Sequence, residues 1–203
     1  DFSRSRGLGD VYKRQLCEAP QMMLHYADIP YEYKMVWDHY GSSWAEVKKD
    51  IIFNRLPILI INEDKYIWQS NTIIRYLSNL TKTKPSDEFQ LAYCDAVFES
   101  THEMFSPLNP TINMTFVEKY NSNKKKLLED ILPTSLNNFE KLLQNSSGNF
   151  FIGNDPYYCD FNAYHHFSMC LILDKNIFSN FPNLKKFINC LLYTSDAADE
   201  TER

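Results

Sequence analysis

A short β-branched run that turns back and passes directly into an amphipathic helix constrains this chain more than any other feature. The run is Pro57–Ile61, and a turn-forming cluster at 62–65 separates it from Tyr66–Trp68, an antiparallel partner. Ser70 then begins a stretch with apolar residues at three- and four-residue spacings over 73–80. The sequence therefore predicts a hairpin followed at once by a helix, with the Ser70 hydroxyl as N-cap.

The pattern around this block separates the chain into two units. Upstream, Glu18–Ala27 predicts a helix that ends near Asp28 and Pro30, and Tyr31–Val36 predicts a strand. Downstream, a polar joint at 81–88 precedes a part without clear strands. Helical spacing there covers 88–105, 124–144, 158–173 and a last helix from Pro182, with prolines expected to separate the segments at Pro107, Pro110, Pro133, Pro156 and Pro182. An α/β unit followed by an all-α unit is expected.

Composition argues against several functional classes. A formal charge of -5 and a hydrophobic fraction of 44% give no basic nucleic-acid surface and no signature of disorder. No run reaches the roughly 18 apolar residues of a membrane span. The five cysteines lack C-x-x-C or zinc-ligand spacing, which predicts reduced thiols in a cytoplasmic protein and no metal site. His165 and His166 are adjacent and point about 100° apart on a helix, which favours interior packing over metal binding.

Both ends of the chain carry sequence that looks foreign to the rest. Residues 5–15 match one reading frame of a sequencing-library adapter, and residues 190–200 match the opposite strand. We therefore expect 1–15 and 190–203 to be translated adapter. The remainder divides into a domain at 16–80, a linker at 81–88 and a helical domain at 89–189.

A small α/β unit precedes a helical one, and it contains Arg55–Ile61 followed by Gln69–Leu77. In these features the chain resembles the cytosolic glutathione transferases. Cys17–Glu32 is similar to the family's first helix and the strand after it. Asp160–Tyr164 and Phe181–Phe187 are similar to helical-domain phrases of its sigma and mu classes. The resemblance implies a thioredoxin-like N-terminal domain, whose first strand falls under the adapter sequence, an all-helical C-terminal domain and a homodimer.

Glutathione is the co-substrate that this resemblance implies. Leu56–Pro57 corresponds to the family's cis-proline clamp, which pairs with the cysteinyl part like an added strand. Taken alone, a Leu-Pro at a strand start is also an ordinary edge proline. Gln69 and Ser70 correspond to the seat of the γ-glutamyl carboxylate at a helix N-terminus, and an N-cap serine without a ligand is the alternative.

Further correspondences concern the charged ends of glutathione. Trp44 and Lys48, four residues apart on a helical turn, match the family's grip on the glycyl carboxylate, although alone they would be a surface tryptophan and a solvated lysine. Arg55 stands where the pattern more often has Gln, Lys or Asn. Glu103 aligns with an acidic group, more commonly Asp, that reaches the γ-glutamyl ammonium across the dimer interface; a solvated helix acid is the alternative.

The helical unit supplies two more expectations. Asp160 matches the family's helix-capping aspartate, but Tyr157 replaces the Ser or Thr three residues earlier, so that the capping box is incomplete. The family's electrophile pockets are lined mainly by this unit. Met104, Phe105 and Phe167 are candidates for that lining, and core packing is the alternative for each.

Catalysis in the family needs a hydroxyl, usually Tyr or Ser near the end of the first strand, bonded to the glutathione sulfur. A thiol with a pKa near about 8.5 is only a few per cent thiolate at neutral pH, so such a donor raises the reactive fraction. Alignment on Glu18 puts this position near Asp10, inside the adapter, and the catalytic residue is therefore unknown. Tyr12 and Arg6–Gly7 imitate family residues at wrong offsets.

The resemblance implies a transferase that conjugates the glutathione thiolate to small electrophiles. A glutathione-dependent isomerase of the prostaglandin D synthase type is the alternative enzyme. A non-catalytic scaffold of the same fold is a third interpretation, which the retained Trp44, Lys48, Gln69 and Ser70 disfavour. A thioredoxin-type oxidoreductase is disfavoured because Cys17 has no partner two residues away.

Overall fold

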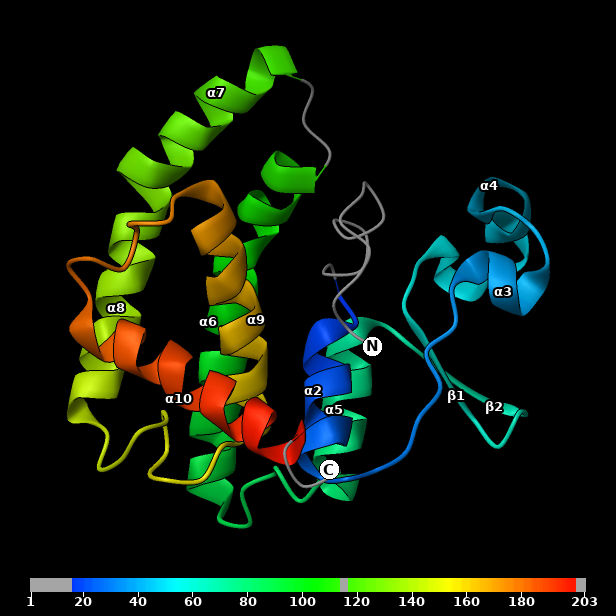
Figure 1. The fold of residues 1–203 in the computed structure, drawn as a ribbon, viewed down its shortest axis with the longest axis horizontal. Coiled ribbons are helices and arrows are strands. Elements are labelled where there is room, and N and C mark those ends of the chain that lie inside the picture. Colours follow the sequence, from blue (N-terminus) through cyan, green and yellow to red (C-terminus); the bar gives the residue numbers. More distant parts are fainter. Residues whose placement is uncertain (1–15, 114–116, 200–203) are drawn as a thin grey trace.

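The computed structural model describes residues 16–113 and 117–199 as a small mixed unit beside a larger bundle of helices (Figure 1). The mixed unit contains α2 (Glu18–Tyr26), α3 (Val36–Tyr40), α4 (Trp44–Val47), the 3₁₀ turns η1 (Lys48–Asp50) and η2 (Ile52–Asn54), β1 (Ile58–Ile61), β2 (Lys65–Trp68) and α5 (Ser70–Leu80). Helices α2 and α5 lie between the hairpin and the bundle.

The predicted hairpin and the helix after it are confirmed. Strands β1 and β2 are antiparallel and pair Ile58 with Trp68 and Ile61 with Lys65. Asn62 and Glu63 in the turn have φ of 51° and 67°, the left-handed conformation on which tight hairpin turns rely. Because α5 begins directly after this hairpin, its position is set by the strands that precede it.

The prediction of a strand at Tyr31–Val36 is wrong. Residues 31–35 have no strand hydrogen bonds with any described residue, and α3 begins at Val36. Tyr31 and Tyr33 remain 47% and 43% exposed. Aromatic content favours an extended backbone, but a strand exists only where a neighbour completes its hydrogen bonds, which local sequence does not reveal.

The bundle has the predicted all-α class over its described residues. It contains α6 (Glu88–Asn113), α7 (Val117–Lys126), the π-helical turn η3 (Leu127–Ile131), α8 (Leu132–Asn145), α9 (Tyr158–Leu173) and α10 (Pro182–Asp199). Within the described part of the chain, none of the helices combines the length and apolarity needed to cross a membrane.

Prolines separate these helices only in part. Pro107 and Pro110 lie inside α6, and Pro133 lies in the first turn of α8. A proline in a first turn removes an N–H that has no helical partner anyway. In α6 the Thr111 hydroxyl donates to the Pro107 carbonyl at 2.9 Å, a side-chain hydrogen bond within the turn that contains both prolines. Pro182 begins α10 as predicted.

Helix α9 is the centre of the molecule. It packs against α6, α2, α10 and α5, and most of its residues are buried (Figure 1). The buried set includes the polar Asp160, Asn162, His165 and His166. Such groups are tolerated in a core only when they find partners, and Asn162 donates to the Thr101 hydroxyl of α6 at 3.0 Å.

Asp160 fixes the start of α9. Its carboxylate accepts the backbone N–H of Tyr157 at 2.8 Å and that of Phe151 at 3.0 Å. The Tyr157 side chain makes no cap hydrogen bond, so the acidic half of the capping box acts alone, and the helix still begins at Tyr158. Burial raises the pKa of Asp160 to about 7, although these N–H donors act in the opposite direction.

We expect Asp160→Asn to destabilise the protein and to change its pH dependence. An amide has a single acceptor oxygen, so one of the two N–H groups loses its partner, at a cost of about 1–3 kcal/mol. The folded-state pKa lies above the ordinary value of 3.8, so the stability that Asp160 contributes is greatest below that value and declines as pH rises toward about 7.

The measurement is urea unfolding of both proteins at several pH values in this window. The free energy of unfolding of the wild type, relative to the variant, should fall as pH rises. A difference between the two proteins that does not change with pH would contradict the assignment.

Candidate functional site

The open end of the hairpin brings two of the predicted segments together. Because Ile58 pairs with Trp68, the residues just outside this pair, Pro57 and Gln69, lie at the same end. The Leu56–Pro57 peptide is cis, as the family resemblance implies, and Leu56 is 38% exposed. An accessible backbone at a strand edge offers its N–H and C=O to an extended ligand.

The prediction that Ser70 is the N-cap of the helix is wrong by one residue. Gln69 holds the cap position with φ 70° and ψ 118°, and its carbonyl accepts the Ile73 N–H at 3.0 Å. The chain needs this left-handed residue to turn from β2 straight into α5, which residue type alone did not indicate. The Gln69 side chain makes no cap hydrogen bond, so the first-turn N–H groups and the Ser70 hydroxyl stand at an uncapped, electropositive helix end.

Trp44 and Lys48 lie on one helical turn, as their spacing predicted. Trp44 is half-buried at the first position of α4, and the backbone N–H of the exposed Lys48 donates to its carbonyl. The turn is fixed by Glu46, which accepts the N–H of Ser43 at 2.9 Å and its hydroxyl at 2.8 Å. These hydrogen bonds also hold the pKa of Glu46 below its ordinary value.

Arg55 and Glu103 lie in different units. Arg55 is extended and exposed immediately before the cis peptide, whereas Glu103 is exposed on α6. Over the described residues, no hydrogen bond or ion pair joins either side chain to Gln69 or Ser70. The expected contact of Glu103 is with glutathione bound to a second subunit, and it stays a prediction.

The three candidates for the electrophile pocket are core residues. Met104, Phe105 and Phe167 are all buried. Phe105 stacks on His166 with ring centroids 4.2 Å apart, and Phe167 packs edge-on against Phe139. Their burial agrees with core packing, the alternative given for each, and not with the lining of an open pocket.

The adjacent histidines are packed in the interior, as expected. Nδ1 of His165 lies 3.1 Å from Oε2 of Glu18 on α2, while Nδ1 of His102 on α6 is buried without a hydrogen-bond partner. Burial lowers the pKa of His166 well below its ordinary value, and His165 and His102 lower it further. No group of three potential metal-ligating side chains among the described residues has an arrangement suited to a metal ion.

Burial suppresses the reactivity of three cysteines. Burial raises the pKa of Cys17 to about 11 and that of Cys170 to about 12, and Cys159 is shifted in the same direction. The described cysteines are all free thiols. A thiol that stays protonated is a poor nucleophile, which argues against the thioredoxin-type interpretation.

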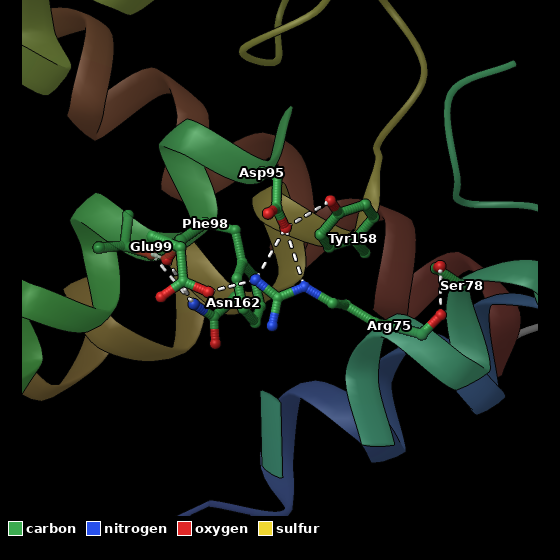
Figure 2. Close-up of polar contacts among 8 residues, drawn as sticks. Arg75, Ser78, Asp95, Phe98, Glu99, Tyr158 and Asn162 are labelled. Atoms are coloured by element: carbon green, nitrogen blue, oxygen red, sulfur yellow. Dashed lines mark hydrogen bonds and ion pairs between the residues drawn. The ribbon is translucent and has the colours of Figure 1, made fainter. Parts of the chain in front are cut away.

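Two contacts between the units were missed at the level of sequence. One is the pair formed by Glu18 and His165. The other joins Arg75 of α5 to Asp95 and Glu99 of α6 (Figure 2). The four-residue spacing of the two acids was a usable sign of a shared cation, but nothing in the sequence indicated which cation.

Comparison with known proteins decides the family. Residues 10–79 match the family model described as Glutathione S-transferase, N-terminal domain, and residues 102–193 match Glutathione S-transferase, C-terminal domain. The chain is 30% identical over 156 residues to Glutathione S-transferase of Plasmodium yoelii yoelii, which covers 74% of this chain and 71% of that protein. The chain belongs to the glutathione S-transferase family.

Two further members of the glutathione S-transferase family agree with this assignment. Glutathione S-transferase P of Caenorhabditis elegans is 27% identical over 176 residues, covering 85% of this chain and 80% of its own. The structure of the Pi-class Glutathione S-transferase of Onchocerca volvulus superposes with a TM-score of 0.80 at 25% identity, covering 93% and 88% of the two chains. The predicted thioredoxin-like domain followed by a helical domain is thereby confirmed.

We expect His166 to make this glutathione S-transferase sensitive to acid. A depressed pKa in the folded state means that the stability is fully present above the ordinary value of 6.5 and is lost as pH falls, since the unfolded chain takes up the proton first. Relative to His166→Leu, the wild type should lose up to about 1.4 kcal/mol of unfolding free energy per pH unit below that value.

Urea unfolding near neutral and mildly acidic pH provides the measurement. The control is Gln144→Leu, at an exposed position of α8 without an ionisable group, which should leave the pH dependence of the wild type unchanged. Parallel pH curves for the wild type and the His166 variant would show that this buried ring does not titrate as inferred.

Proposed function

We propose that the chain binds glutathione at the open end of the hairpin and derives from an enzyme that conjugates the glutathione thiol to small electrophiles. The observation that carries this proposal is the cis Leu56–Pro57 peptide beside Gln69 and Ser70 at the start of α5, in a member of this family. An extended edge and an uncapped helix end, side by side, suit a tripeptide with a carboxylate at each end.

Each segment has a role in this proposal. The backbone of Leu56 pairs with the cysteinyl residue, and the Ser70 hydroxyl with the first-turn N–H groups of α5 holds the γ-glutamyl carboxylate. The Trp44 indole N–H and the Lys48 ammonium hold the glycyl carboxylate. Arg55 adds positive charge beside the bound peptide. This division matches positive or donor groups to both charged ends and leaves the sulfur between them.

The reaction itself is proposed for the natural parent. The sulfur of bound glutathione loses its proton to solvent, and a hydroxyl donor would stabilise the thiolate before attack. The thiolate then forms a carbon–sulfur bond while a leaving group departs from that carbon with its bonding electron pair or, at an activated double bond, while the π pair shifts to the neighbouring carbon and takes up a proton from solvent. The expected position of that hydroxyl, near Asp10, lies outside the described residues, as does Tyr12. Family membership therefore supports the conjugation chemistry, and the cis peptide beside the start of α5 supports glutathione binding.

The other interpretations are less well supported. The curated relatives compared above carry transferase names, which does not favour the isomerase alternative. A non-catalytic scaffold would not need Trp44, Lys48, Gln69 and Ser70 together. Failure of the chain to bind glutathione would restore the scaffold interpretation.

Several finer assignments belong to the same proposal. Residues 1–15 and 190–203 are translated adapter, and the native part comprises a domain at 16–80, a linker at 81–88 and a helical domain at 89–189. The class is sigma- or mu-like, supported by Asp160–Tyr164 and Phe181–Phe187, and the compartment is the cytoplasm. The upstream transcript would test the first assignment directly, by showing whether a Tyr or Ser codon precedes Leu16 at the family's distance.

We expect Ser70→Ala and Lys48→Met each to weaken glutathione binding about tenfold, because each removes a donor to a charged carboxylate. Isothermal titration calorimetry with glutathione gives the dissociation constant without requiring catalysis. Lys141→Met, an exposed lysine of α8, is the matched control and should bind like the wild type. If a protein carrying its native first strand shows no binding, the proposed function is refuted.

We also propose a homodimer in which Glu103 of one subunit approaches the glutathione ammonium of the other. Asp95, Glu99 and Glu103 recur at four-residue intervals on α6 and form one acidic face. Ile52 and Phe53, just before the cis peptide, expose 54% and 60% of their surface. An apolar pair of this kind beside the site is a surface that a second copy would cover.

We expect mixed dimers to distinguish a role of Glu103 in its own subunit from a role in the other one. A dimer of one Ser70→Ala chain and one Glu103→Gln chain has one intact and one doubly altered site if Glu103 acts across the interface. Calorimetry should then show one glutathione per dimer bound with wild-type affinity. Two weakened sites, one altered at Ser70 and the other at Glu103, or a monomer near 23.9 kDa in ultracentrifugation, would contradict the arrangement.

A further inference from the structure

Arg75 lies at the centre of a polar cluster that joins three helices (Figure 2). Its Nε donates to Oδ1 of Asp95 at 2.9 Å, and a terminal guanidinium nitrogen bonds Glu99 one turn further along α6. The guanidinium also lies over the Phe98 ring, 4.6 Å from its centroid. The Tyr158 hydroxyl of α9 donates to the same Asp95 oxygen at 3.0 Å. We call Arg75, Asp95, Phe98, Glu99 and Tyr158 the Arg75 cluster.

The Arg75 cluster is better suited to fixing geometry than to stabilising the fold. The side chains of Arg75 and Asp95 keep 37% and 44% exposure, and ion pairs that exposed contribute about 0–1 kcal/mol. The cluster restricts the orientation of Arg75 more strongly than it contributes to stability. A planar guanidinium that is bonded to two acids and stacked on a ring has few alternative positions. Burial raises the pKa of Tyr158, with Cys94 and Asp95 adding to the shift, so the phenol keeps the proton that it donates to Asp95.

Arg75 shares helix α5 with the proposed carboxylate seat. Ser70 begins this helix, and a rise of 1.5 Å per residue places the two backbone positions about 7.5 Å apart along the axis. A helix this short moves as one rod, so a restraint on Arg75 also restrains the N–H groups of the first turn. On α6, Asp95 and Glu99 belong to the same face as Glu103, so the cluster also sets the direction of that acidic face.

We propose that Arg75 is a positioning residue for glutathione: by clamping α5 to Asp95 and Glu99, it holds the Ser70 end of the helix where the γ-glutamyl carboxylate is bound. This inference rests on the proposed glutathione site. Arg75 itself does not touch the ligand. Its effect on affinity passes through the orientation of α5, so it should become smaller when the Ser70 hydroxyl is absent and only the first-turn N–H groups remain.

A double-mutant cycle between Arg75 and Ser70 tests this, with glutathione affinity of the full chain measured by calorimetry. Arg75→Met should raise the dissociation constant about fivefold when Ser70 is present and less than about twofold in the Ser70→Ala background, because coupled residues are non-additive. Arg75→Lys should behave like Arg75→Met, since an ammonium keeps the charge but lacks the fork. Lys141→Met should leave the affinity unchanged.

Glu99→Gln is a milder variant that tests the same link if the Arg75 variants fold poorly, and it should raise the dissociation constant about twofold when Ser70 is present. Wild-type affinity in the Arg75 and Glu99 variants, or an equal loss with and without Ser70, would overturn the positioning role while leaving the proposed function intact. Absence of glutathione binding by the wild type would overturn the proposed function, and the positioning role with it.

Discussion

The burial of α9 is the constraint on which the rest of the structure depends. A helix packed on nearly every side has to satisfy its polar groups inside the protein, and Asp160, Asn162 and His165 do so through partners outside α9. The N–H of Tyr158 donates to the Thr83 carbonyl at 2.9 Å, which attaches the start of α9 to the segment between the two units. Both units therefore rest on one helix, and the orientation of α2 and α5 follows from how they pack against it.

The candidate glutathione site combines parts that form at different levels of structure. The Leu56–Pro57 and Gln69–Ser70 segments meet because the strands between them pair locally, so their proximity requires little beyond the hairpin. Trp44 and Lys48 lie on short helical pieces that precede the hairpin, and Glu103 belongs to the other unit. A ligand with charge at both ends suits such a site, since each carboxylate can be bound by a group from a different element.

The links between the two units differ in physical character. His165 is almost fully buried where it meets Glu18, so loss of that carboxylate would remove a polar contact inside the core. The Arg75 cluster is half-exposed and contributes little to the free energy of folding. It restricts the rotation of α5 about its axis and its shift along α6. A weak interaction can thus matter for a binding site more than for folding, because affinity depends on the placement of donors to within a fraction of an ångström.

The sequence by itself determined the hairpin, helix α5, the helical second unit and the Leu-Pro and Gln-Ser phrases, because periodicity and turn chemistry are local properties. Only the tertiary structure decided that Tyr31–Val36 does not form a strand, because the segment lacks a described neighbour to pair with. It also decided that Phe105 and Phe167 are buried in the core, where neighbouring helices cover them. Tertiary structure also decided that the N-cap is Gln69 and not Ser70, because the turn out of β2 fixes the backbone conformation of Gln69. Periodicity reports which face of an element is apolar, whereas pairing, covering and capping depend on what the rest of the chain places against that face.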